Sequence, residues 1–144
     1  MLRAVIDPNV FVSAQVSSLG HPARIGRAAV DRRFEMIISE HLLAELSTVL
    51  MRARFRRCLA QSEVRKVIKD LREKGAIFED IETERLVPDD PKDDYLIALA
   101  RASGADYLVS GDPHPHGLEG ANLPVVLTPR RFWELLEQKA PKKP

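Results

Sequence analysis

Four acidic side chains hold positions where a parallel α/β fold could bring them together. Asp7 and Asp112 each follow a short apolar segment that is typical of a buried strand. Asp94 lies in the first turn of an expected helix, and Glu45 lies on another, at the border of its apolar stripe. Converging carboxylates repel one another unless a cation lies between them, and such oxygen ligands favour Mg²⁺ or Mn²⁺ over zinc. An ion of this kind activates water and polarises a phosphoryl oxygen, so the pattern indicates phosphodiester hydrolysis.

Each of these acids also has a simpler interpretation. Asp7 before Pro8 is a good helix N-cap, and Asp112 suits an Asx turn. Asp94 can complement a helix dipole, and Glu45 can be an ordinary solvated side chain. The metal hypothesis therefore rests on the joint placement of the four residues rather than on any one of them.

Strand-like and helix-like segments alternate along the chain. Strands are expected over residues 3–6, 35–39, 77–81, 106–110 and 124–128, and helices over residues 9–17, 22–33, 40–51, 63–74, 92–103 and 130–139. This alternation predicts right-handed crossovers and a mostly parallel sheet with helices on both faces, a three-layer α/β/α sandwich. In such sheets ligands bind beyond the carboxyl ends of the strands, where the strand order reverses, so Asp7 and Asp112 are expected at that edge.

Residue types at the segment ends predict where the helices begin and end. Ser39, Ser62 and Asp90 suit N-caps for the helices that follow them. Gly75 and Gly104 are expected to end helices. The last expected helix carries four large apolar residues: Phe132, Trp133, Leu135 and Leu136. Core packing is favoured for most of them, and a homodimer interface remains an alternative for the others.

The composition is that of one globular domain, expected over residues 1–139 with a frayed tail at 140–144. The 144 residues are 44% apolar and carry 22 basic and 21 acidic side chains, a formal net charge of +1. This near-neutral charge excludes a protein that binds nucleic acid through bulk charge alone. The single cysteine excludes a disulfide framework and fits a cytoplasmic location, and no apolar run of about 18 residues predicts a membrane span.

Charge is distributed unevenly along the chain. Residues 52–74 hold nine bases and three acids, a net charge of +6, whereas residues 79–94 have a net charge of −6. The basic segment is either a solvated surface or an arm that holds a polyanion near the acids. Its first four bases are the candidate RNA-binding residues: Arg52, Arg54, Arg56 and Arg57.

Four stretches of the chain resemble the PIN domain. They are RAVIDPNVFVSA at 3–14, SEHLLAEL at 39–46, DDPKDDYLIALARASGADYLVSGD at 89–112 and PVVLTPRRF at 124–132. The resemblance covers almost the whole chain, and the third stretch is its most specific part. The most similar group is that of the toxin components of bacterial toxin–antitoxin systems.

The resemblance implies a Mg²⁺- or Mn²⁺-dependent ribonuclease that is paired with a small antitoxin protein. It implies that Asn9 supports the first aspartate and that four acids form the metal cluster: Asp7, Glu45, Asp94 and Asp112. One departure is Pro8, because the family usually has Thr or Ser directly after the first aspartate. That change removes a hydroxyl and a backbone N–H. It keeps open the alternative of a catalytically weak RNA- or protein-binding module.

Overall fold

The computed structural model describes residues 1–16, 21–57, 60–79, 91–111 and 125–139. Within them one sheet contains β1 (Arg3–Ile6), β2 (Glu35–Ile38), β3 (Ala76–Ile77), β4 (Tyr107–Val109) and β5 (Val125–Leu127). The strand order is β3-β2-β1-β4-β5, and every neighbouring pair is parallel. Strands β2 and β3 lie on one side of β1, and β4 and β5 lie on the other side. The strand order therefore reverses between β1 and β4. The predicted parallel sheet is confirmed.

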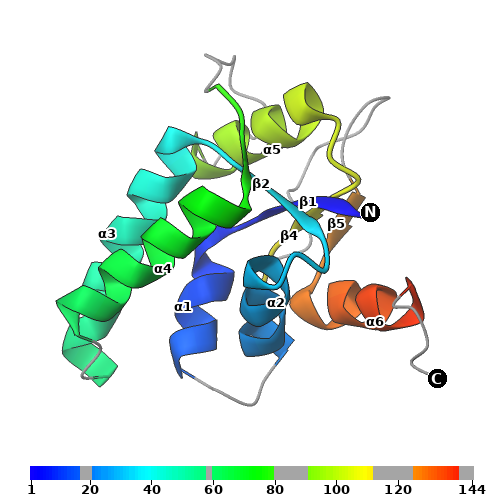
Figure 1. The fold of residues 1–144 in the computed structure, drawn as a ribbon. Coiled ribbons are helices and arrows are strands. Elements are labelled where there is room, and N and C mark those ends of the chain that lie inside the picture. Colours follow the sequence, from blue (N-terminus) through cyan, green and yellow to red (C-terminus); the bar gives the residue numbers. More distant parts are fainter. Residues whose placement is uncertain (17–20, 58–59, 80–90, 112–124, 140–144) are drawn as a thin grey trace.

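Six helices surround this sheet in the described residues. They are α1 (Pro8–Val16), α2 (His21–Val30), α3 (Glu40–Arg57), α4 (Gln61–Lys74), α5 (Pro91–Ser103) and α6 (Pro129–Lys139). Figure 1 shows α5 on one side of the sheet and the other helices on the opposite side, which confirms the three-layer arrangement. Each helix in these residues is too short or too polar to cross a bilayer.

Three segments end several residues away from their predicted ends. Helix α3 continues six residues beyond Met51, and β3 is only two residues long, with residues 80–81 outside the described part. Helix α2 stops at Val30 because Arg32 adopts a positive φ of 56°. The Arg32 N–H then donates to Ala29 O at 3.2 Å and the Arg33 N–H to Ala28 O at 2.9 Å, a Schellman ending. The expected tail at 140–144 lies outside the described residues.

The predicted helix caps are partly confirmed. Ser39 Oγ accepts the Leu42 N–H at 3.1 Å and so caps α3. Ser62 is not a cap: α4 begins earlier, after Ala60, whose N–H donates to Glu63 Oε1 at 3.4 Å. Gly75 ends α4, and its N–H donates to Leu71 O at 2.8 Å. Gly104 ends α5 with a φ of 69°, while the expected cap Asp90 lies outside the described residues.

The core lies on both faces of the sheet and is almost wholly aliphatic. The strands β1 and β2 contribute consecutive buried residues, as expected of strands covered on both sides. Phe34 and Phe132 meet edge to face with ring centroids 4.9 Å apart, and both are fully buried. Phe132 and Leu136 of α6 therefore pack in the core, as predicted, whereas Trp133 and Leu135 are half-buried.

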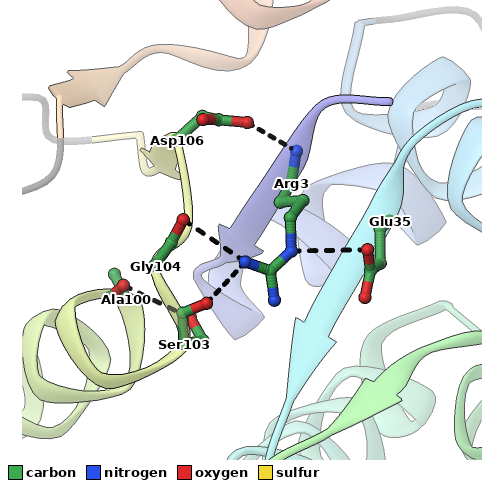
Figure 2. Close-up of polar contacts among 6 residues, drawn as sticks. All are labelled: Arg3, Glu35, Ala100, Ser103, Gly104 and Asp106. Atoms are coloured by element: carbon green, nitrogen blue, oxygen red, sulfur yellow. Dashed lines mark hydrogen bonds and ion pairs between the residues drawn. The ribbon is translucent and has the colours of Figure 1, made fainter.

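Arg3 ties the start of β1 to the turn before β4 (Figure 2). Its guanidinium donates to Ser103 O at 2.6 Å and to Gly104 O at 3.4 Å, and its Nε lies 3.3 Å from Glu35 Oε2. Its backbone N–H donates to Asp106 Oδ2 at 3.0 Å. These contacts lie at the amino-terminal edge of the sheet, opposite the carboxyl edge where Asp7 follows β1.

Candidate functional site

Asp7 lies at the point where the strand order reverses, directly after β1. Its N–H donates to Val109 O at 2.9 Å, which continues the pairing of β1 with β4 by one residue. Its carboxylate accepts the Asn9 N–H on Oδ1 at 2.9 Å and the Ser110 hydroxyl on Oδ2 at 3.2 Å. The residue is only 9% exposed. The carboxylate is therefore held by donors on both oxygens in the crevice where parallel sheets bind ligands.

The helix-cap interpretation of Asp7 is also confirmed. The Asn9 N–H bond is the N-cap bond of α1, and the Val10 N–H donates to Asp7 O at 2.9 Å. Pro8 is buried at the first position of α1, where its lack of an N–H removes no bond from the helix. Capping and metal binding do not exclude each other, because each carboxylate oxygen has two lone pairs. In the described residues, the contact from Asn9 to Asp7 is made by the Asn9 backbone N–H.

Glu45 and Tyr95 join the start of α3 to the start of α5. The Tyr95 hydroxyl donates a hydrogen bond to Glu45 Oε2, and both side chains are half-buried. The exposed His41 ring stacks on Tyr95, with centroids 4.0 Å apart and planes inclined by 8°. Glu45 is therefore not a purely solvated side chain. Its position at the border of the core agrees with the position predicted from the helix periodicity.

The backbone position of Asp94 follows from the same contact. Asp94 is the residue before Tyr95 in the first turn of α5, so the Tyr95–Glu45 bond brings that turn close to Glu45. The side chain of Asp94 and the whole of Asp112 lie outside the described residues. In the sequence, Asp112 is two residues after Ser110, the hydroxyl donor to Asp7.

A complete metal cluster stays a prediction. Among the side chains that the structure describes, no three His, Cys, Asp or Glu residues gather as a metal-binding group. The side chains that the structure describes include only two of the four predicted ligands, Asp7 and Glu45. Both are carboxylates, the ligand type that hard divalent cations prefer, so this part of the donor set fits Mg²⁺ or Mn²⁺.

The predicted basic arm is formed by the end of α3 and by α4, which pack side by side (Figure 1). Arg52 is exposed, whereas the side chains of Arg54, Arg56 and Arg57 lie outside the described residues. Arg72 is not available as a free cation, because it forms a two-pronged ion pair with Glu40, with Nη2 3.1 Å from Oε2. The hydrogen bond that Arg72 donates to Glu40, together with the negative charge of Glu40, raises the pKa of Arg72.

Ser110, Tyr95 and His41 were missed as site residues by sequence reasoning. Ser110 ends the segment predicted as a strand, and parallel pairing with the first strand would have placed it beside Asp7. Tyr95 directly follows Asp94, but its partner Glu45 is 50 residues away. Only the relative placement of α3 and α5 identifies that pair.

Comparison with known proteins agrees with this architecture. The family model of the PIN domain matches residues 3–114, about three quarters of the chain, including the whole of β1 through β4. No curated protein matches the sequence. PIN domains are generally nuclease domains that bind RNA and typically use divalent metals. With its 3-2-1-4-5 parallel sheet and the buried aspartate at the reversal point, this chain belongs to the PIN-domain family.

Proposed function

We propose that this chain is a metal-dependent endoribonuclease that acts as the toxin of a toxin–antitoxin pair. The observation that supports this best is the Asp7 carboxylate, which is nine-tenths buried at the crevice between β1 and β4 and held on both oxygens. A carboxylate fixed in this way requires no reorganisation when it binds a cation, which is the condition for effective electrostatic catalysis.

Asp7, Glu45, Asp94 and Asp112 would hold Mg²⁺ or Mn²⁺. The bound ion would supply Lewis acidity toward a phosphoryl oxygen and a lowered pKa for water. The chain's own part is positioning: Ser110 and the Asn9 N–H orient Asp7, and Tyr95 orients Glu45. Hydrolysis by water in line with the leaving oxygen gives products with a 5′-phosphate and a 3′-hydroxyl. Pro8 lowers the rate without abolishing it, because it leaves the Asp7 contacts in place.

The substrate is single-stranded RNA, and the basic arm (residues 52–74) contributes to its binding. Four of its bases follow one another closely at the end of α3: Arg52, Arg54, Arg56 and Arg57. Replacing Arg56 and Arg57 by Glu should weaken RNA binding and flatten its dependence on salt, because fewer counterions are released. An unchanged salt slope would mean that the arm is solvated or serves the antitoxin.

The direct test is cleavage of labelled single-stranded RNA with Mn²⁺ or Mg²⁺ and with EDTA. We expect cleavage only with the metal, and products that carry a 5′-phosphate. Expression of the wild type in bacteria should also arrest growth, and co-expression of the small protein from a neighbouring gene should relieve the arrest. RNA binding without cleavage in any metal would favour the binding-module alternative instead.

A further inference from the structure

Two aromatic rings lie face to face beside Glu45, one of the candidate metal ligands. The His41 ring of α3 stacks on the Tyr95 ring of α5, with centroids 4.0 Å apart and planes inclined by 8°. The Tyr95 hydroxyl donates to Glu45 Oε2. Because Tyr95 is half-buried and His41 is exposed, Tyr95 is the inner ring of the pair and His41 is the outer one. We call these two residues the His41–Tyr95 stack.

The outer ring of the stack offers a flat aromatic surface to a ligand. Tyr95 covers one face of the imidazole, so the solvent-accessible part of the ring lies on its other face and its edges. The hydrogen bond to Glu45 limits rotation of the Tyr95 ring, and the parallel contact with Tyr95 limits rotation of the His41 ring. A ring that is already ordered loses little conformational entropy when a second planar group stacks on it. The stack is therefore suited to a planar ligand.

The stack lies at the same edge of the sheet as Asp7. In the parallel pair of β1 and β2, Val5 lies opposite Ile37. Two residues further along each strand, Asp7 is level with Ser39. Ser39 caps α3, and His41 follows within the first turn of that helix. The stack and the candidate site therefore share the carboxyl edge of the sheet, where parallel sheets bind their ligands.

The acid next to His41 in the sequence is neutralised by an ion pair. Both carboxylate oxygens of Glu40 contact the guanidinium of Arg72 on α4, and the distance from Oε2 to Nη2 is 3.1 Å. This ion pair offsets the repulsion that the Glu40 carboxylate would exert on a phosphate group. A polyanion therefore approaches the stack without meeting an uncompensated charge at position 40.

We propose that the His41–Tyr95 stack binds a nucleobase of the single-stranded RNA substrate, next to the phosphate that is cleaved. This deepens the proposed function and rests on it. A metal held by Glu45 would contact the phosphate, and the outer ring of the stack would hold the base of an adjoining nucleotide. An aromatic peptide side chain would also stack on His41, but it carries no phosphate for a metal at Glu45. Since a base must leave a duplex to stack on a protein ring, the stack favours single-stranded over double-stranded RNA.

The first test measures the binding of a labelled single-stranded RNA to the full chain by fluorescence anisotropy. Ca²⁺ replaces Mn²⁺, because it takes the same oxygen ligands and screens the candidate carboxylates, and a denaturing gel shows that the RNA stays intact. His41→Ala should weaken binding by about fivefold to tenfold, near the lower limit for the loss of one base–aromatic stack. His41→Phe keeps an aromatic ring and should bind like the wild type.

The control for a change on a helix surface is Gln138→Ala, which truncates an exposed side chain near the end of α6. It should bind RNA like the wild type. If His41→Ala also binds like the wild type, the proposal is overturned.

An abasic strand shows whether His41 acts through a base. This strand has the same length and the same sugar–phosphate backbone as the RNA but carries no bases. The wild type and His41→Ala should bind it with equal affinity, because the group that stacks on His41 is gone. If His41→Ala weakens binding of the abasic strand as much as binding of the RNA, His41 contacts the backbone, and the proposal is overturned.

Cleavage kinetics with Mn²⁺ distinguish base binding from proton transfer. A contact that is equally strong in the bound substrate and in the transition state affects KM and not kcat. His41→Ala should therefore raise KM by about fivefold to tenfold at an unchanged kcat, and His41→Phe should restore KM. A lower kcat in both variants at an unchanged KM would assign His41 to proton transfer and would overturn the stacking proposal.

Failure of the nuclease proposal would give a different result. RNA binding that depends on His41 and on the bases, without any cleavage in Mn²⁺, would overturn the nuclease proposal and retain the stack. Cleavage by the wild type, with the same KM and the same RNA affinity in His41→Ala, would overturn the stack and retain the nuclease.

Discussion

The Ser110 hydroxyl donates to Asp7 Oδ2 at 3.2 Å, although the two residues are 103 positions apart in the chain. The contact joins the carboxyl ends of β1 and β4, the two strands between which the order of the sheet reverses. Because the Asn9 N–H already holds Oδ1, the carboxylate cannot rotate without losing a hydrogen bond. Ser110 is therefore a positioning residue for Asp7.

Ser110→Ala should lower the rate of RNA cleavage by about tenfold, the cost of one hydrogen bond to a charged acceptor. The Mn²⁺ concentration that gives half the maximal rate should rise, since the carboxylate is less well ordered. Ser110→Thr keeps the hydroxyl and should restore both quantities. If Ser110→Ala leaves the Mn²⁺ dependence unchanged, the hydroxyl has a structural role only.

Tyr95→Phe should release Glu45 while retaining the ring that stacks on His41. We expect weaker Mn²⁺ binding by about tenfold to a hundredfold, the range for loss of a group that orients a metal ligand. Tyr107→Phe on β4 is the matched control, since it removes a tyrosine hydroxyl away from Glu45. Calorimetric titration with Mn²⁺ measures the effect, and equal affinities for the two variants would contradict the assigned role of Tyr95.

Mn²⁺ should raise the melting temperature of the wild type, because an ion that binds only the folded state stabilises it. Asp94→Asn should reduce that rise, since one ligand is lost. Without metal the variant should be as stable as the wild type or more so, because one of the repelling carboxylates has been removed. A rise in Asp94→Asn equal to that of the wild type would exclude Asp94 from the site.

Gly75→Ala should destabilise the fold by about 1–3 kcal/mol, a cost typical of overpacking. A Cβ at this position would lie 2.9 Å from both Ile38 Cδ1 and Leu71 O. Gly26→Ala in α2 is the opposite case, because its Cβ would meet Phe11 at an ordinary 3.7 Å. It should stabilise the helix by about 0.5–1 kcal/mol. Urea denaturation of both variants checks the two signs, and a loss of equal size in both would contradict this account of Gly75.

The sequence predicted the parts of the fold that local patterns control. Buried apolar runs at β1 and β2 identified the central strands, and Ser39 identified the start of α3. Ser62 was a plausible cap, but α4 begins two residues earlier than predicted, directly after Ala60. There the side chain of Glu63 supplies the capping contact. The end of α3 carries no glycine or proline near Met51, so its extension to Arg57 had no local signal.

The same distinction applies to the candidate site. The positions of Asp7 and Glu45 in the fold could be predicted, because the end of a strand and the border of a helix stripe are visible in the sequence. Their donors could not, since Ser110 and Tyr95 reach them only through the packing of β4 beside β1 and of α5 beside α3. All four acids stay predictions as ligands of a metal cluster, and Asp94 and Asp112 also lack described side chains.

The central claim is that Asp7 is a metal ligand in a nuclease, and single-turnover cleavage of a labelled single-stranded RNA tests it most directly. The wild type and Asp7→Asn are compared at saturating Mn²⁺, after thermal unfolding has shown that the variant is folded. The asparagine Oδ1 can still accept the Asn9 N–H, and its Nδ2 group can donate to Ser110 Oγ instead of accepting from it, so the cap of α1 should persist. We predict that cleavage falls by about a hundredfold or more, because the charge that holds the ion is lost. Equal cleavage rates for the folded variant and the wild type would contradict the claim.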